Sequence, residues 1–324
     1  MWKRIFSVAL CGLLLCLCAG CGGFKSDGAF TYLLPQNVTS LDPQTATSAS
    51  SELVMNSMFE GLCRIDEKGE TVPGVAKGWE HNDTFTQFTF FLRPDAQWSD
   101  GTPVTAQDFV FGITRALSSG SGALAEDLLL IQNARAFASG EVDSSSLGVV
   151  AEDENTLVIR LEKSNPDFPA LTAEAHYMPC NQAYFEECSG HYGLSSEYLI
   201  TNGPFTFGNV YAWQTDSGER SITLTRSDTY HGDREVRPAS VTFLIDYDQA
   251  FDTDPVTALL NGDVDIMTLT QDQAMDAKEQ GCGILTLNDA VTGLLLNPQS
   301  EKLENATMRS MFFKTLNRSD LLAQ

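Results

Sequence analysis

Basic residues are scarce in this chain of 324 residues. Lysine and arginine total 20 against 43 aspartates and glutamates, which gives a formal net charge of −23. A field of this sign repels nucleic acid and anionic lipid headgroups, so the charge argues against binding to either of them. High negative charge also keeps an exported protein soluble, and by itself it identifies no ligand.

Recognisable catalytic and metal-binding patterns are also missing. The four histidines do not occur in HExxH or another metal-binding spacing, and the sequence has no GxSxG, Walker A or GxGxxG motif. Asp246, Asp248, Asp252 and Asp254 lack the glycine and terminal glutamate of an EF-hand loop, and we interpret them as an acidic loop before a helix. We therefore predict that the protein is not an enzyme and has no cofactor and no metal site.

Long apolar runs are absent except near the N-terminus. Lys3 and Arg4 precede an apolar segment over residues 5–17, and small residues follow it. This segment is too short for a transmembrane helix, and the pattern predicts a signal peptide over residues 1–20. The protein is therefore expected to be exported.

The end of the signal region predicts a lipid anchor. Ala19-Gly20-Cys21 resembles a bacterial lipobox, in which the cysteine receives a diacylglyceryl group and becomes the first mature residue. We expect lipidation of Cys21, a tether over residues 21–28, and anchoring to the outer face of the cytoplasmic membrane. The alternative is an ordinary cleaved signal without a lipid, which would give a periplasmic protein.

Four of the eight cysteines lie in the signal region, which leaves Cys63, Cys180, Cys188 and Cys282. An exported protein can form disulfides, and a bond between Cys180 and Cys188 would close a small loop. Free buried thiols are an equally good interpretation, and no CxxC or Cys/His spacing indicates zinc.

Hydrophobic periodicity predicts an α/β protein, and the chain length predicts two or three compact units. The alternation of Phe88, Phe90 and Leu92 predicts a strand, and Thr105 with Asp108 predicts the capping box of a helix over residues 106–117. Further strands are predicted at residues 29–34, 157–161, 222–224, 241–245 and 264–267, and further helices at residues 51–61, 125–138 and 255–261.

Six segments, in order, resemble the family 5 extracellular solute-binding proteins, the oligopeptide- and dipeptide-binding components of bacterial ABC importers. They are Leu41-Asp42-Pro43 with Met58-Phe59-Glu60-Gly61-Leu62; residues 72–80, VPGVAKGWE; residues 91–109, including WSDGTPVTAQDF; Asn202-Gly203-Pro204-Phe205; Gly262-Asp263-Val264-Asp265-Ile266; and Asn297 with residues 305–309 and 316–318. We interpret most of these residues as parts of the scaffold, and not as ligand contacts.

The resemblance implies an α/β, two-lobed periplasmic-binding-protein-like fold of type II with an extra inserted domain. Lobe I would comprise residues 29–61 and 175–286, the inserted domain residues 62–174, and an incomplete second lobe residues 287–324. Because members of this family continue well beyond the residue that matches Gln324, we interpret the sequence as a truncated product or partial record, or else as a short natural form.

The resemblance also implies a function: capture of peptides by a monomer that delivers them to the permease and ATPase subunits of an ABC importer. The expected ligand-binding wall of lobe I is the loop Thr47-Ser48-Ala49-Ser50, joined by Thr268 and Thr270 and by Asn288 and Val291. A peptide could pair its backbone with such segments as an added strand. Alternatives are another solute, such as a nickel chelate or an oligosaccharide, and a peptide-sensing surface receptor.

Overall fold

A computed structural model describes residues 28–119, 126–215, 221–233, 235–245, 255–284, 305–307 and 310. The chain divides into two units, Met1–Asp276 and Ala277–Gln324, and the sheets belong to the first. Several predictions fall outside the described residues: the signal peptide and Cys21, the acidic loop Asp246–Asp254, Asn288 and Val291, and most of the proposed start of lobe II. Among the described helices, none is both long enough and apolar enough to cross a bilayer.

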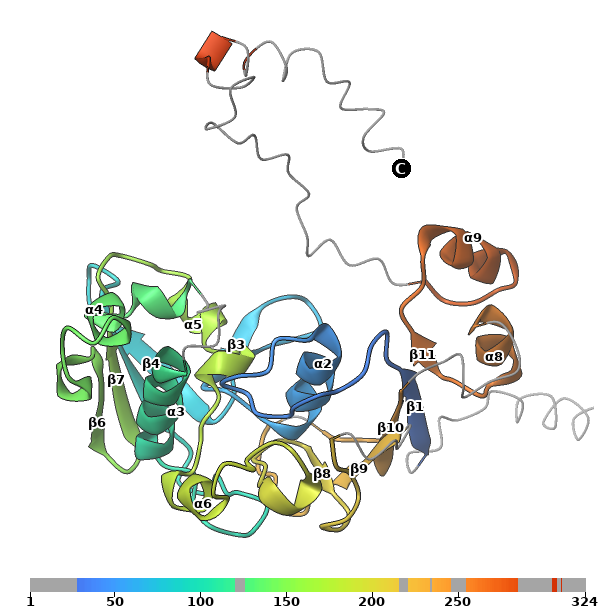
Figure 1. Cartoon of the computed structure of the whole chain (residues 1–324), viewed down its shortest axis with the longest axis horizontal. Coiled ribbons are helices and arrows are strands. Elements are labelled where there is room, and N and C mark those ends of the chain that lie inside the picture. The colour runs from blue at the N-terminus through green and yellow to red at the C-terminus, as the bar shows by residue number, and fades with distance from the viewer. Residues whose placement is uncertain are drawn as a thin grey trace, which may run out of the picture. The chain divides into compact units, whose positions relative to one another are not determined.

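A five-stranded mixed sheet has the order β11-β1-β10-β9-β8 (Figure 1). Strand β1 pairs in parallel with β10 and β11, whereas β9 pairs antiparallel with both β10 and β8. Strands β1, β9, β10 and β11 were predicted near these positions, but β11 is shorter than expected because it pairs with β1 over two residues. The bounds are β1 Ala29–Leu33, β8 Phe205–Phe207, β9 Ser221–Arg226, β10 Ser240–Leu244 and β11 Ile266–Met267.

Alternate side chains of β1 pack on opposite faces of this sheet. On one face, Tyr32 lies against Phe243, with ring centroids 6.0 Å apart. On the other face, Leu33 forms a small buried cluster with Ala258 of α8 (Pro255–Asn261) and with Val264. Helix α8 ends at the predicted place, where Gly262 adopts φ +78, a conformation that costs glycine little.

Helix α2 (Ala49–Met58) begins earlier than predicted. The side chain of Ser48 accepts a hydrogen bond from the Ser51 amide at 3.1 Å and caps the helix. Ala49 and Ser50 were expected in a loop but lie in the first helical turn, so that part of the prediction is wrong. The core-facing stripe contains Val54, Met55 and Met58, while Leu53 and Ser57 are half-buried beside it.

A second sheet, antiparallel throughout, has the order β4-β5-β7-β6. The predicted alternation in β5 is confirmed, because Phe88, Phe90 and Leu92 are buried and the residues between them are half-buried. Helix α3 (Ala106–Ser118) packs against β6 and β7 (Figure 1). The bounds are β4 Ala76–His81, β5 Gln87–Leu92, β6 Val149–Asp153 and β7 Thr156–Arg160; a separate hairpin pairs β2 (Cys63–Ile65) with β3 (Thr71–Pro73).

The helix predicted over residues 125–138 is wrong. The chain forms a short 3-10 helix, η2 (Leu128–Leu130), and then α4 (Ala134–Ala138), separated by Asn133 in the left-handed conformation at φ 62. The interruption has a tertiary cause: the amide of Gln132 donates to the carbonyl of Arg160, and its carbonyl accepts from the amide of Gly148, each at 2.9 Å. These bonds require an extended backbone there.

Short helices connect the remaining segments. They are η3 (Ser144–Ser146), α5 (Phe168–Leu171), η4 (Ala175–Tyr177), α6 (Gln182–Glu187) and η5 (Ser196–Tyr198), followed near the end of the described chain by α9 (Gln271–Glu279). Cys180 and Cys188 flank α6 as free, buried thiols, so the disulfide left open above is not formed. Burial raises the pKa of the Cys180 thiol to about 12 and that of Cys188 to about 11.

Candidate functional site

The carboxyl ends of the three parallel strands meet at one edge of the five-stranded sheet. Leu33 pairs with both Leu244 and Met267, and the Leu34 amide continues the pairing by donating to the Leu244 carbonyl at 2.9 Å. In open α/β sheets, ligands bind outside the carboxyl ends of the strands. This edge is therefore the candidate binding site.

The predicted segment Thr47–Ser50 follows β1 and lies at the start of α2. The four residues have different roles: Thr47 and Ala49 are exposed, whereas the side chain of Ser48 caps the helix. Ser50 is buried, and its hydroxyl accepts a hydrogen bond from the Gln36 amide at 3.0 Å. Thr47 and Ala49 can therefore contact a ligand, whereas the side chain of Ser50 stabilises the loop after β1.

The predicted residues Thr268 and Thr270 follow β11 at the same edge, and both are exposed. Thr270 also precedes α9, where its amide and hydroxyl donate to Gln273 Oε1 at 3.0 and 3.1 Å. Part of its hydrogen-bonding capacity is thus used to begin the helix. Thr268 remains the better candidate for a ligand contact from this segment.

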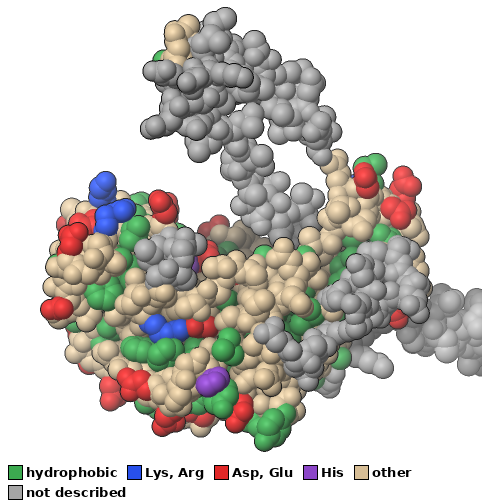
Figure 2. All heavy atoms as spheres, in the orientation of Figure 1, with side chains coloured by type: hydrophobic (Ala, Val, Ile, Leu, Met, Phe, Trp, Pro, Cys, Tyr) green, Lys and Arg blue, Asp and Glu red, His purple; other side chains and the backbone are tan. Residues whose placement is uncertain are grey.

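Acidic groups lie beside the first turn of α2. Burial raises the pKa of the Glu174 carboxyl, and the negative charge of Glu52 raises it further. His176 Nε2 lies within hydrogen-bonding distance of Asp127 Oδ2, at 2.6 Å. On the face shown in Figure 2, acidic side chains are more widespread than basic ones. The electrostatic environment near α2 therefore disfavours anionic groups.

A groove of about 500 Å³ lies on the face of the five-stranded sheet beside α2, and sequence reasoning did not locate it. Its apolar lining includes Phe30 and Tyr32 of β1, Phe243 of β10, Leu53 of α2 and Phe205. None of the predicted ligand residues that the structure describes lines this groove. Phe205 belongs to the signature segment Asn202–Phe205, but its place in a groove depends on strands far away in the chain.

Most of the signature residues stabilise the scaffold, as predicted from the sequence. Trp98 is fully buried, and its indole N–H donates to Asp108, which also accepts from the Thr105 amide at 2.8 Å and caps α3. The Asn202 side chain accepts from the Glu60 amide at 3.2 Å and donates to the Glu60 carbonyl at 2.9 Å. These bonds join two of the six signature segments to each other.

Gly203 permits close packing between these segments. Its amide donates to the Met58 carbonyl at 2.8 Å, and a Cβ atom at Gly203 would lie 2.5 Å from the Met58 carbonyl carbon. A side chain cannot be placed there without moving the end of α2. In the part of the chain that the structure describes, no group of three or more histidine, cysteine, aspartate or glutamate side chains is arranged to hold a metal ion.

Comparisons with known proteins place this geometry in context. The family model described as "Bacterial extracellular solute-binding proteins, family 5 Middle" matches residues 70–324. The periplasmic murein peptide-binding protein MppA of Escherichia coli (strain K12) is 42% identical over 169 residues, which are 51% of this chain and 31% of that protein.

Two solved structures share the fold. The substrate-binding domain of an oligopeptide ABC transporter from Bacillus anthracis str. Ames superposes with a TM-score of 0.70 at 28% identity, over 80% of this chain and 48% of that one. The peptide-binding pheromone receptor PrgZ superposes with a TM-score of 0.73 at 26% identity, over 92% of this chain and 58% of that one. The chain thus covers about half of their lengths. The predicted fold class, α/β and of the type II periplasmic-binding-protein kind, is confirmed.

Proposed function

Because the chain belongs to the bacterial extracellular solute-binding proteins of family 5, we propose that it captures peptides for import by an ABC transporter. The observation that carries the proposal is the edge formed by β11, β1 and β10, where exposed Thr47, Ala49 and Thr268 follow the strands. An extended peptide would bind along these segments through its backbone, and this mode leaves side-chain selectivity broad.

The similar proteins support the peptide class of ligand and the transport role. One is named a murein peptide-binding protein, and one is the substrate-binding domain of an oligopeptide ABC transporter. In this role the protein would release its ligand to permease subunits driven by ATPase subunits. It would act by binding, and not by catalysis.

Peptide sensing is the second candidate function, and the similarity to a pheromone receptor favours it. The chemistry at the edge would be the same in both roles. Permease and ATPase genes adjacent to this gene would support import, whereas their absence would favour a receptor.

We also propose the domain division and the anchor predicted from the sequence. All strands of the five-stranded sheet lie within residues 29–61 and 175–286, and all other strands lie within residues 62–174, which supports an inserted domain. Anchoring at Cys21 is supported by the lipobox-like Ala19-Gly20 before it. Metabolic labelling with a palmitate analogue should fail in Cys21→Ala, and retained labelling would refute the anchor.

Replacing Ala49 by proline tests peptide binding at the edge. Ala49 is the first residue of α2, where proline is tolerated, and Ser48 already has the extended conformation that a following proline requires. The change removes only an amide donor at the exposed start of the helix. If a ligand carbonyl uses that donor, Kd for the peptide should rise about tenfold or more, while the free energy of unfolding stays nearly constant.

The control is Gln182→Pro, which also places proline at the first position of a helix but in α6, which does not follow a strand of this edge; it removes in addition the exposed hydrogen bond from Gln182 to Glu186. Kd is expected to stay constant in the control. Calorimetric titration of the full-length protein with defined peptides measures both variants. An unchanged Kd in Ala49→Pro would remove this segment from the site. Wild-type protein that binds an oligosaccharide or a nickel chelate, but no peptide, would refute the peptide assignment.

A further inference from the structure

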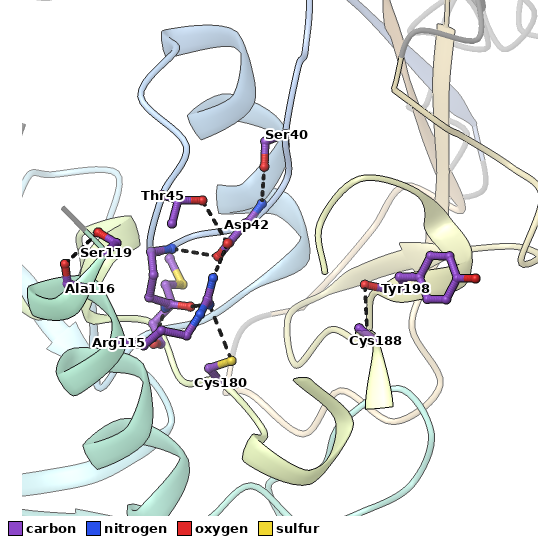
Figure 3. A network of polar contacts seen from close by, with 11 residues as sticks. Ser40, Asp42, Thr45, Arg115, Ala116, Ser119, Cys180, Cys188 and Tyr198 are labelled. Carbon is purple, nitrogen blue, oxygen red and sulfur yellow. Dashed lines mark hydrogen bonds and ion pairs between the residues drawn. The ribbon is translucent and has the colours of Figure 1, made fainter. Parts of the chain in front are cut away.

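A buried arginine connects α3 to the turn that leads into the candidate ligand segment. The side chain of Arg115 is 13% exposed and forms an ion pair with Asp42, whose side chain is 7% exposed. Its Nη1 also donates to Gln44 Oε1 at 2.7 Å. Figure 3 shows Arg115 extending from α3 toward Asp42, with Cys180 beside it. One guanidinium thus binds two residues of the same turn.

Asp42 organises this turn through its backbone and its carboxylate. Its carbonyl accepts from the amides of Thr45 and Ala46 at 3.1 and 2.9 Å. Its carboxylate accepts from the Gln44 amide at 3.1 Å and from the Thr45 hydroxyl at 2.8 Å. The position of Asp42 therefore determines the path of the chain up to Ala46, and Thr47 is the next residue.

The opposite side of the turn is held against residues 178–193. The Gln44 side chain donates to the Met178 carbonyl at 2.9 Å. Gly193 has φ +74, and a Cβ atom there would lie 2.5 Å from the Asp42 amide nitrogen. The turn consequently lies between α3 and this segment, with no room for it to shift toward Gly193.

Arg115 is itself fixed in place. Its guanidinium carbon lies 4.2 Å from the ring centroid of Phe185 and 5.2 Å from that of Tyr192. Burial lowers the pKa of Arg115, but the hydrogen bond and charge of Asp42 outweigh that effect and raise it, so the arginine stays charged. Cys180, a buried thiol that is neutral at physiological pH, lies 3.7 Å from Nη1 and does not compete for the charge.

We propose that Arg115 is a positioning residue for ligand binding: it holds the turn over residues 42–46 so that Thr47 and Ala49 face the ligand. The expected effect of Arg115 on ligand affinity rests on the proposed function, whereas its expected effect on the turn does not. It assigns to α3, a helix of the four-stranded sheet, an influence on a site that follows a strand of the five-stranded sheet.

The test variant is Arg115→Lys. A lysine lacks the two separate nitrogens with which the guanidinium binds Gln44 and Asp42, and it loses the flat contact with Phe185 and Tyr192. If the turn then occupies its binding-competent conformation about one tenth of the time, Kd rises about tenfold. Hydrogen exchange at the Thr45 and Ala46 amides should accelerate by at least that factor in the ligand-free full-length protein, because exchange follows the open population of the turn.

Two further variants separate positioning from general stability. Ile113→Val trims a fully buried apolar side chain on the same helix and leaves the Arg115 contacts in place, so it should lower Tm without changing Kd or the exchange of the two amides. Gln44→Met keeps the Asp42–Arg115 pair and should raise Kd even if Arg115→Lys fails to fold.

Each combination of results supports or overturns the positioning role of Arg115. Faster exchange at Thr45 and Ala46 with a higher Kd, absent in Ile113→Val, supports the proposal. Unchanged exchange overturns it, and so does faster exchange with an unchanged Kd in a wild type that binds peptides. A wild type that binds no peptide refutes the proposed function instead, and exchange still reports whether Arg115 holds the turn.

Discussion

The two larger sheets differ in how completely they are covered. In the four-stranded sheet, Phe88, Phe90 and Leu157 are at most 1% exposed. In the five-stranded sheet, Phe30 and Tyr32 are only half-buried and line a groove of about 500 Å³. The segments that follow the carboxyl ends of β1 and β11 contain exposed residues, such as Thr47 and Thr268. One sheet therefore forms a closed core, whereas the other combines a core with an open edge.

This difference separates the residues that identify the family from those that can contact a ligand. Trp98, Asp108 and Asn202 belong to signature segments, and all three are buried and hydrogen-bonded within the protein. Thr47 and Ala49 at the open edge are small and have no distinctive pattern. The family motifs in this chain thus indicate how the scaffold is built, whereas the fold decides which of the candidates suggested by the resemblance are exposed.

The largest effect is expected in the closed core. Phe90→Ala should lower the free energy of unfolding by about 3–5 kcal/mol, because it leaves a cavity beside Phe88 and Trp79. Phe91→Ala is the matched control, since Phe91 is the next residue on the strand, faces the other side of the sheet and is half-buried. The loss of unfolding free energy in Phe91→Ala should be less than about half of that in Phe90→Ala. Urea denaturation measures both, and equal losses would contradict a closed face at Phe90.

An intermediate loss of unfolding free energy is expected where two signature segments contact each other. Asn202→Asp removes the donor to the Glu60 carbonyl and places a carboxylate against that oxygen in a buried site. The expected loss is about 1–3 kcal/mol. Asn209→Asp is the control, because exposed Asn209 uses only its oxygen, as the acceptor for the Tyr211 amide. An unchanged free energy of unfolding in Asn202→Asp would show that this junction contributes little to the stability of the scaffold.

The smallest effect is a dependence on pH. Burial raises the pKa of Asp108, despite the hydrogen bonds that it accepts, so its ionisation costs stability. The Tm of the wild type minus that of Asp108→Asn should be constant below about pH 4. It should then decrease as pH rises through the raised pKa, because the buried carboxyl ionises at a cost in stability.

Asp153 should show the opposite dependence of stability on pH. Its pKa is lowered by hydrogen bonds from the Asn155 amide and the Thr156 hydroxyl. The corresponding difference for Asp153→Asn should favour the wild type above about pH 4 and disappear as pH falls through the lowered pKa. Thermal scans across pH measure both variants. Slopes of the same sign would contradict the buried environment assigned to Asp108.

Elements with a strong local pattern could be predicted from the sequence. The alternation in β5 and the Thr105–Asp108 cap of α3 depend on residues close together in the chain, and both are confirmed. The helix predicted over residues 125–138 failed because Gln132 pairs with Arg160 and Gly148, which periodicity within one segment cannot reveal. Thr47–Ser50 was singled out by resemblance, but the inward role of Ser50 was visible only in its contact with Gln36.

The sequence by itself determined the class of the protein, because charge, composition and ordered motifs are properties of the chain and need no contacts. It also determined most strands and helices, through short-range periodicity and capping. Only the tertiary structure decided that Arg115 would meet Asp42, 73 residues away, and that β1, β10 and β11 would end at one edge. Those contacts depend on which buried surfaces pack together, and the local sequence around each residue does not specify that packing.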